Sequence, residues 1–322
     1  MLPTHFPAAR YRFEFTVETP IRLPEYAGST LRGVFGNALR RTACVTRERE
    51  CKPCPLYRSC PYPAVFETPA PEQHALQKFS QIPNPYIVEP PDWGERVYAP
   101  GETLAFHLVL VGQALRHLPL IVLAWQRAFG HGVGKGDGTA RLERVVHEPN
   151  MATMGRPMDM RKGDAVFEAG EGVLRDHAQT IGRAMPDAAA TGRPITLHFT
   201  TPLRLQHNGK PIGAPELTAR DLLVGLVKRT ALISEFHLGQ KLDLDFHALA
   251  DAASAIESEK KLRWRDWARY SNRQKQEMAL GGVVGDWALH GDLTPFLPFL
   301  HLGQWLHVGK NATFGLGRYE LA

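Results

Sequence analysis

The chain has 322 residues, of which 43% are hydrophobic and 22% charged, and its formal net charge is +5. This composition excludes a disordered protein and indicates a globular one long enough for two domains. The longest apolar run, 118–129, is interrupted by Pro119, Gln126 and Arg127 and is shorter than the roughly 20 residues a membrane-spanning helix needs. The N-terminus also lacks the layout of a signal peptide, so we expect a cytoplasmic protein without membrane contact.

Basic charge is concentrated toward the two ends of the sequence. Residues 1–60 and 260–322 together carry nine more basic than acidic residues, whereas 61–259 carry four more acidic than basic residues. If the fold brings the ends together, they form a basic face of the kind that binds a polyanion. Ordinary solvated surface charge is the alternative explanation.

The first half of the chain predicts strands and helices in alternation. Apolar residues from Ser29 to Ala43 recur at the spacing of an amphipathic helix, with Ser29 or Thr30 as its cap. A region rich in Cys and Pro follows, and 150–193 has no clear period and is predicted to be a linker. In order, we predict a strand at 11–17, a helix at 29–43, an insertion at 44–75, a strand at 103–111, a helix at 117–129 and a strand at 140–146.

The second half repeats this plan. Thr218 caps a helix that has Asp221 three residues after the cap, and a strand pair is predicted to turn near Gly281 and Gly282. The predicted elements are a strand at 195–205, a helix at 218–228, the strand pair within 267–289, a helix at 294–306 and a last strand ending at Leu321.

Each half therefore reads β-α-β-β-α-β, with a glycine-rich loop before its final strand. The two loops share letters, Val133-Gly134-Lys135 against Val308-Gly309-Lys310, which indicates a weak internal duplication. The sequence predicts an α+β protein made of two tandem ferredoxin-like (RRM-like) domains. Their predicted bounds are 1–149, with the Cys-rich insertion 44–75, and 194–322, joined by the linker 150–193.

The glycine-rich loops, 130–138 and 309–317, do not fit known nucleotide-binding patterns. A P-loop needs Ser or Thr after its lysine, and a dinucleotide fingerprint needs a strand before the loop, so we expect no nucleotide cofactor. Loops with little side-chain bulk expose backbone N–H groups to a phosphodiester, whose charge a lysine can neutralise. A tight turn without a ligand is the alternative. The candidate RNA contacts here are Gly309, Gly315, Gly317 and Lys135.

All four cysteines lie within seventeen residues, with the spacing C-x6-C-x2-C-x5-C. Four thiolates can surround one zinc ion tetrahedrally and leave no position open, so the first expectation is a structural zinc ion. Because Pro follows two of the cysteines, an iron–sulfur cluster is a second interpretation, and disulfides or free thiols are a third. The candidate ligands are Cys44, Cys51, Cys54 and Cys60.

Residues 260–275 combine seven basic residues and one acid with Trp264, Trp267 and Tyr270. Cations that pair with phosphates beside rings that stack on unpaired bases are what RNA binding requires. The alternative is that the tryptophans belong to the core and the charges are merely solvated. The candidate RNA-binding residues here are Arg263, Trp264, Arg265, Arg269 and Arg273.

Four segments together resemble one known family. They are YAGSTLRGVFG at 26–36, CPLYRSCPYP at 54–63, RYSNRQ at 269–274 with LGG at 280–282, and LHVGKNATFGLGRY at 306–319. These segments are similar to those of CRISPR-associated endoribonucleases that process precursor RNA, in the repeat-associated RNA-binding (RAMP) superfamily. The segment at 306–319 is the most specific, because it joins a helix, His-x-x-Lys and a glycine loop in one order.

The resemblance implies tandem ferredoxin-like domains that bind CRISPR repeat RNA and cut it on the 3′ side of a hairpin. It implies attack by the 2′-hydroxyl without a catalytic metal, giving a 2′,3′-cyclic phosphate or 3′-phosphate and a 5′-hydroxyl. The alternative is a non-cleaving RAMP-type subunit of a CRISPR effector complex, and a metal-dependent enzyme unrelated to RNA is a third class.

The sequence departs from the family in one respect. Many relatives place a catalytic histidine in or near the first helix, and 26–42 contains none. We therefore predict His307 as general acid or base, with Lys310 three residues further on and with Ser29 and Arg32 facing it across an inter-domain cleft. The alternative role for His307 is to bond the last carbonyls of its helix, and His301 is its best substitute.

Overall fold

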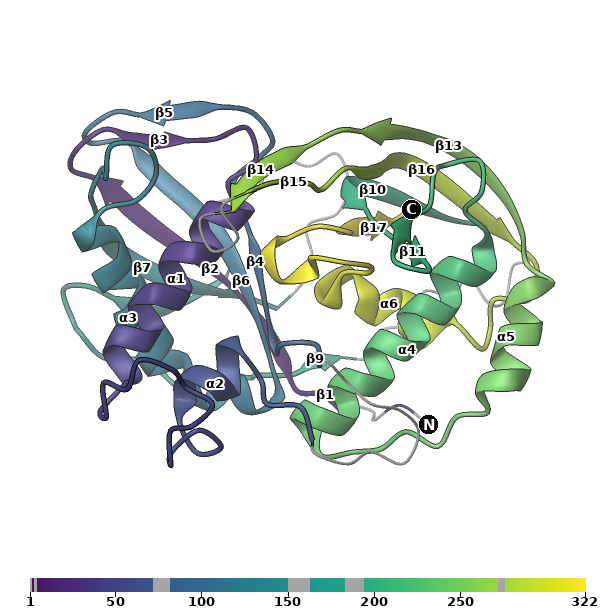
Figure 1. Ribbon diagram of the computed structural model, residues 1–322, viewed down its shortest axis with the longest axis horizontal. Helices are drawn as coiled ribbons and strands as arrows, with labels where there is room; N and C mark the ends of the chain where they lie inside the picture. Colours follow the sequence, from purple (N-terminus) through teal and green to yellow (C-terminus); the bar gives the residue numbers. More distant parts are fainter. Residues whose placement is uncertain (1, 3–4, 72–81, 150–162, 183–193, 272–275) are drawn as a thin grey trace.

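The computed structural model describes residues 2, 5–71, 82–149, 163–182, 194–271 and 276–322. Two α+β halves pack against each other (Figure 1). Among the described residues, no helix is long and apolar enough to cross a membrane.

The N-terminal half is built on an antiparallel sheet with the strand order β4-β6-β2-β7-β8. Helices α1 and α3 pack on one face of this sheet (Figure 1). The elements are β1 (His5–Phe6), β2 (Ala8–Val17), β3 (Ile21–Leu23), α1 (Gly28–Ala43), α2 (Pro61–Phe66), β4 (Tyr86–Glu89), β5 (Arg96–Tyr98), β6 (Thr103–Val111), the 3-10 helix η1 (Gly112–His117), α3 (Leu118–His131), β7 (Ala140–Glu148), β8 (Asp164–Glu168) and β9 (Ile181–Gly182).

The C-terminal half has a four-stranded antiparallel sheet with the order β13-β16-β10-β17, against which α4 and α6 pack. Its elements are β10 (Ile195–Leu203), β11 (Gln206–His207), β12 (Lys210–Pro211), α4 (Ala219–Leu238), α5 (Phe246–Ser254), β13 (Glu257–Arg265), β14 (Ala268–Ser271), β15 (Gln276–Ala279), β16 (Gly282–His290), α6 (Leu297–Leu306), the 3-10 helix η3 (Ala312–Phe314) and β17 (Tyr319–Leu321).

The predicted α+β class is confirmed, and three details of the prediction differ from the structure. The helix α1 begins at Gly28 after Ala27, so Ser29 and Thr30 lie inside it and neither caps it. The segment 150–193 contains β8, which extends the N-terminal sheet, and β9, which pairs with β1. The strands β13 and β16 do not turn at Gly281 and Gly282; they continue into β14 and β15, and the connection at 272–275 lies outside the described residues. Gly282 is instead a packing position, because a Cβ there would lie 2.5 Å from the carbonyl oxygen of Leu203.

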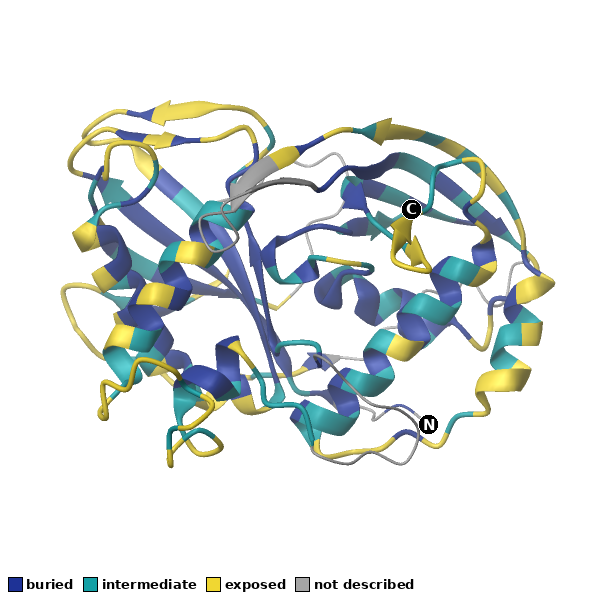
Figure 2. Ribbon diagram, viewed as in Figure 1, coloured by how far each residue is buried: buried dark blue, intermediate teal, exposed yellow. Residues whose placement is uncertain are grey.

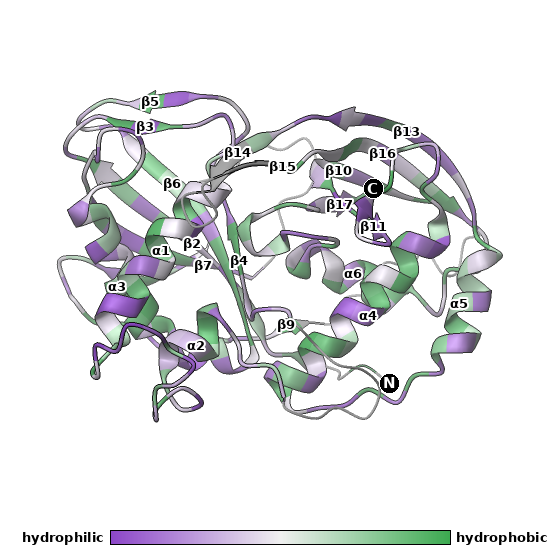
Figure 3. Ribbon diagram, viewed as in Figure 1, coloured by the Kyte–Doolittle hydropathy of each residue, from purple (hydrophilic) through white to green (hydrophobic). Residues whose placement is uncertain are grey.

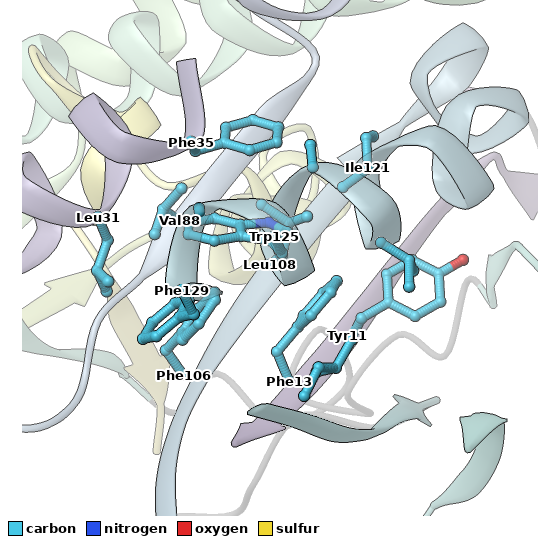
Figure 4. Packing of buried hydrophobic residues seen from close by; sticks show 14 of the residues in the cluster. Tyr11, Phe13, Leu31, Phe35, Val88, Phe106, Leu108, Ile121, Trp125 and Phe129 are labelled. Carbon is cyan, nitrogen blue, oxygen red and sulfur yellow. The ribbon is translucent and has the colours of Figure 1, made fainter. Parts of the chain in front are cut away.

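An aromatic core holds α1 and α3 on the N-terminal sheet. The Trp125 ring of α3 stacks on Phe35 of α1 at 4.9 Å and lies 4.5 Å from Phe106 of β6 (Figure 4). Phe129 stacks on Phe15 at 4.0 Å. Aromatic pairs at such distances stabilise a core by about 1 kcal/mol beyond the area they bury.

The opposite face of the same sheet is also covered, because residues alternate between the two faces of a strand. Near one end, Ala8, Ile87, Val109 and Val111 belong to the hydrophobic core of the C-terminal half. The strands are accordingly buried along most of their length (Figure 2). The two halves therefore share a core and are not linked by a flexible tether alone.

Charged residues occupy the middle of that covered face. Arg10, Arg12 and Glu14 of β2 are at most 5% exposed. Both arginines pair with Glu148 of β7, and Arg12 Nε donates to Glu14 at 2.7 Å. Buried charges are tolerated only when paired and hydrogen-bonded, so this network constrains which side chains can lie between the halves.

We predict that His107, on β6 in this network, makes stability depend on pH. Burial and then Arg10 lower the pKa of His107 to about 4, from an ordinary value of 6.5. Between these two values the unfolded chain binds a proton that the folded chain does not, so stability falls as pH falls, by up to ~1.4 kcal/mol per pH unit from this group. Denaturant unfolding from pH 7 to pH 4 should show a smaller slope in His107→Gln. An unchanged slope would contradict the assignment.

Candidate functional site

His307 lies at the junction between the halves and is completely buried. It follows the last residue of α6 and has φ of 54°, a backbone conformation that is uncommon for a residue with a side chain. Its Nε2 is 3.0 Å from Oε1 of Glu89 in the other half, and its Nδ1 is 3.2 Å from the carbonyl oxygen of Leu316. Burial lowers the pKa of His307, and Glu89 partly opposes that effect.

This burial bears on the predicted role of His307. A general acid or base must come within hydrogen-bond reach of the proton it transfers, and a ring with no exposed surface is not in that position. Its ring does not bond the last carbonyls of α6 either, as the alternative role required; it bridges Glu89 of the N-terminal half and the Leu316 carbonyl near the end of the loop. The substitute candidate His301 is half-buried on α6, with its ring 5.0 Å from Trp305. Proton transfer by His307 stays a prediction.

The start of α1 touches the glycine-rich loop 309–317. Tyr26 donates from its hydroxyl to the carbonyl oxygen of Phe314 at 2.8 Å, and a Cβ at Gly28 would overlap that same oxygen. A Cβ at Gly315 would lie 2.6 Å from the Tyr26 hydroxyl. These glycines therefore permit close packing between the halves, and Ser29, half-buried in the first turn of α1, directly follows this contact.

The rest of the loop packs on the C-terminal end of β10 and the residue that follows it. The backbone N–H of Lys310 donates to the carbonyl of Arg204 at 2.9 Å, and Gly317 donates to the carbonyl of Pro202 at 3.0 Å. Gly309 lies against the Arg204 carbonyl, where a side chain would collide. The Lys310 side chain itself is exposed, so its charge is available at the surface.

The chain just after the basic strand β13 contacts this loop, because Trp267 packs against Phe314. Arg263 and Trp264 are exposed, and Arg204 donates from Nη1 to the carbonyl of Gly281 at 2.6 Å, beside the Trp264 ring. Figure 3 shows β13 as one of the most hydrophilic strands. Arg204 therefore lies between the backbone of Lys310 and the Gly281 carbonyl, next to which the Trp264 ring packs.

The other predicted residues fall in different places. Arg32 lies with its guanidinium 4.4 Å from the centre of the Phe66 ring, near Tyr86, and is not brought beside Lys310. Arg265 covers the Trp93 ring at 4.7 Å. Trp267 is core, as its alternative reading held, packed against Tyr26 at 4.9 Å. The side chain of Arg269 and the whole of Arg273 lie outside the described residues.

Two residues of this site were missed by the sequence reasoning. Arg204 had a signal, because the run TPLRL at 201–205 repeats TPIRL at 19–23. Glu89 had none, because its partner His307 is 218 residues away in the sequence.

The four cysteines line a cavity of about 180 Å³ beside the C-terminal end of α1, together with Arg40. The hydroxyl of Thr46 is 3.5 Å from the sulfur of Cys54 and 3.9 Å from that of Cys44. The donor set suits zinc, but in the described part of the chain no three His, Cys, Asp or Glu side chains are grouped closely enough to hold one ion. Zinc stays a prediction, as does an iron–sulfur cluster.

Comparisons with known proteins agree with this geometry. Residues 6–179 match the family AF_1859_N, described as an N-terminal domain, and residues 197–319 match the family described as CRISPR-associated endoribonuclease Cas6. The chain belongs to the CRISPR-associated RAMP family of CRISPR RNA-processing proteins. No curated protein matches it in sequence.

Solved structures of Cas6 proteins share the fold. The Cas6 protein TTHB231 in a product complex has a TM-score of 0.55 at 16% identity, with 98% of this chain and 100% of that chain covered. Thermus thermophilus Cas6 (TTHB231) gives 0.52 at 15%, with both chains fully covered. A chain of a partial Cas6-RT-Cas1–Cas2 complex gives 0.56 at 16%, and this RAMP-family chain spans 47% of its length.

We predict that purified protein contains about one zinc ion per chain, since four thiolates satisfy one tetrahedral site. Metal analysis by mass spectrometry measures this directly. Cys54→Ser should lower both the zinc content and the melting temperature, whereas Ser59→Ala, an exposed neighbour, should change neither. Zinc-free protein with an unchanged melting temperature in Cys54→Ser would contradict a structural metal.

Proposed function

We propose that this RAMP-family protein is an endoribonuclease that cuts CRISPR precursor RNA within its repeats to release guide RNAs. The match of residues 197–319 to the Cas6 endoribonuclease family supports a nuclease. The observation that carries the proposal is the meeting of α1 with the loop 309–317, from which the cation Lys310 is exposed. RNA lying along β13 would pass over this junction.

A finer proposal concerns the fold. In each half the first strand is flanked by the third and the fourth, as in β4-β6-β2-β7 and β13-β16-β10-β17. That order, with one helix after the first strand and one after the third, is the ferredoxin-like arrangement. It supports two ferredoxin-like domains, the first carrying the Cys-rich insertion 44–75.

The proposed chemistry is attack of a 2′-hydroxyl oxygen on the adjacent phosphorus. The new O2′–P bond forms as the P–O5′ bond breaks, one proton leaves O2′, and one is taken up by O5′, which gives a 2′,3′-cyclic phosphate and a 5′-hydroxyl. Lys310 and Arg204 would stabilise charge on the phosphorane, and the Ser29 hydroxyl would orient the substrate. His307, held by Glu89, would position the loop that carries Lys310.

A second candidate is a non-cleaving RNA-binding protein, retained by subunits of a CRISPR effector complex. The burial of His307 and the absence of histidine from 26–42 favour it, because neither of these places supplies an accessible imidazole for proton transfer. Incubation with a hairpin repeat RNA in EDTA separates the two candidates. Cleavage at one site supports the nuclease, and tight binding without products supports the second candidate.

We predict that Lys310→Ala slows single-turnover cleavage by about 10²-fold, since one lost charge contact to a transition state has roughly that effect. Lys241→Ala, an exposed lysine after α4, is the matched control and should cleave normally. Equal rates in the two variants would remove Lys310 from the site.

For His307 we predict a loss of cleavage that is accompanied by a loss of stability. His307→Ala leaves Glu89 without this partner and opens a cavity, which costs about 2–5 kcal/mol. Denaturant unfolding and single-turnover cleavage are measured on the same protein. A 10²–10⁴-fold slower cleavage with unchanged stability and RNA binding would instead support direct proton transfer by His307.

Arg263→Ala should weaken RNA binding at every repeat sequence and reduce the slope of log affinity against log salt by about 1, because one phosphate contact is lost. Filter binding over a series of salt concentrations measures the slope. An unaltered slope would contradict contact between Arg263 and phosphate.

A further inference from the structure

The two halves share a second short sequence repeat, and in each half the repeat contacts the glycine-rich loop. Residues 19–23 read TPIRL and residues 201–205 read TPLRL. The first run begins two residues after the end of β2, and the second run overlaps the end of β10. Since β2 and β10 are the first strands of the equivalent sheets, the runs occupy corresponding places in the fold.

Each run makes the same backbone contacts with the glycine-rich loop of its own half. The N–H of Lys135 donates to the carbonyl of Arg22 at 3.1 Å, as that of Lys310 does to Arg204 at 2.9 Å. A Cβ at Gly134 would collide with the Arg22 carbonyl, as one at Gly309 would with Arg204.

The threonines of the two runs correspond as well. Thr19 accepts at Oγ1 from the N–H of Thr139 at 2.8 Å, and Thr201 accepts at Oγ1 from the N–H of Arg318 at 2.9 Å. The two substructures are therefore copies of one arrangement.

These contacts explain why glycine and threonine occupy their positions, but they do not explain why arginine and lysine occupy theirs. A carbonyl of any residue would accept the loop N–H, and a lysine N–H donates no better than another. Yet an arginine and a lysine stand at the paired positions in both halves. Arg22 and Lys135 are both exposed, so packing does not require their charges either.

The surface around Arg22 is open and continuous with the basic strand. Val97, which faces Arg22 across the β3–β5 pair, is 59% exposed. Trp93, just before β5, lies under the guanidinium of Arg265 at the end of β13. In Figure 1 the β3–β5 pair and the strands β14 and β13 follow one another along the same edge of the molecule.

We propose that Arg22 and Lys135 form a second contact for the phosphodiester backbone of RNA, the N-terminal counterpart of Arg204 and Lys310. A strand bound at the C-terminal loop would continue past Trp93 to this pair. The contact is independent of base sequence, since it consists of charge and backbone alone. It rests on the proposed RNA binding, and Asp137 in the same loop limits its strength.

The test compares double variants by filter binding of a hairpin repeat RNA with single-stranded flanks, over a series of salt concentrations. R22A/K135A should reduce the slope of log affinity against log salt by about 2, equally for repeats of unrelated sequence. The control R41A/R116A removes the same charge at two exposed positions elsewhere and should leave the slope nearly unchanged. Asp137→Asn should tighten binding.

The outcomes separate the two proposals. If the unaltered protein and K310A bind the RNA equally weakly, with no salt dependence, the proposed RNA function fails. If the unaltered protein binds tightly and R22A/K135A has the slope of R41A/R116A, only the second contact is overturned. Circular dichroism of each variant shows whether it is folded, and Arg22→Lys with Lys135→Arg should restore the slope because the charges are kept.

Discussion

The carboxylate of Glu89 is the group on which the arrangement of the two halves depends. It is 2% exposed on β4, between Arg10 of its own sheet, whose Nη2 is 2.7 Å away, and His307 of the other half. Burial is the largest single effect and would raise its pKa, but Arg10, Arg318 and His307 together outweigh it, and the pKa lies well below the ordinary value. An ionised carboxylate in such a place is tolerated only with these partners, so the position of His307 is fixed relative to the N-terminal sheet.

The fixed position of His307 in turn fixes the loop 309–317, which carries Lys310. His307 lies two residues before Gly309, the first residue of the loop 309–317, and its ring also contacts the Leu316 carbonyl near the end of that loop. Arg229 of α4 donates to the carbonyl of Leu306 at 2.8 Å, which holds the end of α6 from the other side. The loop is thus held at both ends, and Lys310 projects from a rigid support. Rigid support matters because a charge that stabilises a transition state acts only if it is already in place.

Several features of this arrangement were within reach of sequence patterns. The amphipathic spacing from Ser29 to Ala43 predicted α1 well, because one face of that helix packs on an apolar sheet. The capping box at Thr218 and Asp221 is also present as predicted. Local rules of this kind describe interactions between residues that are close in the sequence.

Other features depend on contacts between distant residues. The sequence pattern places His307 just past a helix, which suggests an accessible side chain. Nothing nearby in the sequence indicates that the N-terminal half, through Glu89, covers it. Arg32 lies one turn after Ser29, but the Phe66 ring of the Cys-rich insertion draws its guanidinium away from the loop. The pair Gly281 and Gly282 resembled a turn, although close packing against Trp264 and Leu203 is what requires glycine there.

The duplicated Thr-Pro-x-Arg-Leu contact shows how one arrangement can serve two different purposes. In the C-terminal half the loop is extended by η3, and this extension packs against α1 and β4. In the N-terminal half the loop 130–138 turns back at once, through the bridge between Val133 and Gly138. The C-terminal loop is therefore part of the packing between the two halves. The short copy keeps its arginine and lysine in solvent, and charge retained there without a packing role is most simply explained by a ligand of opposite charge.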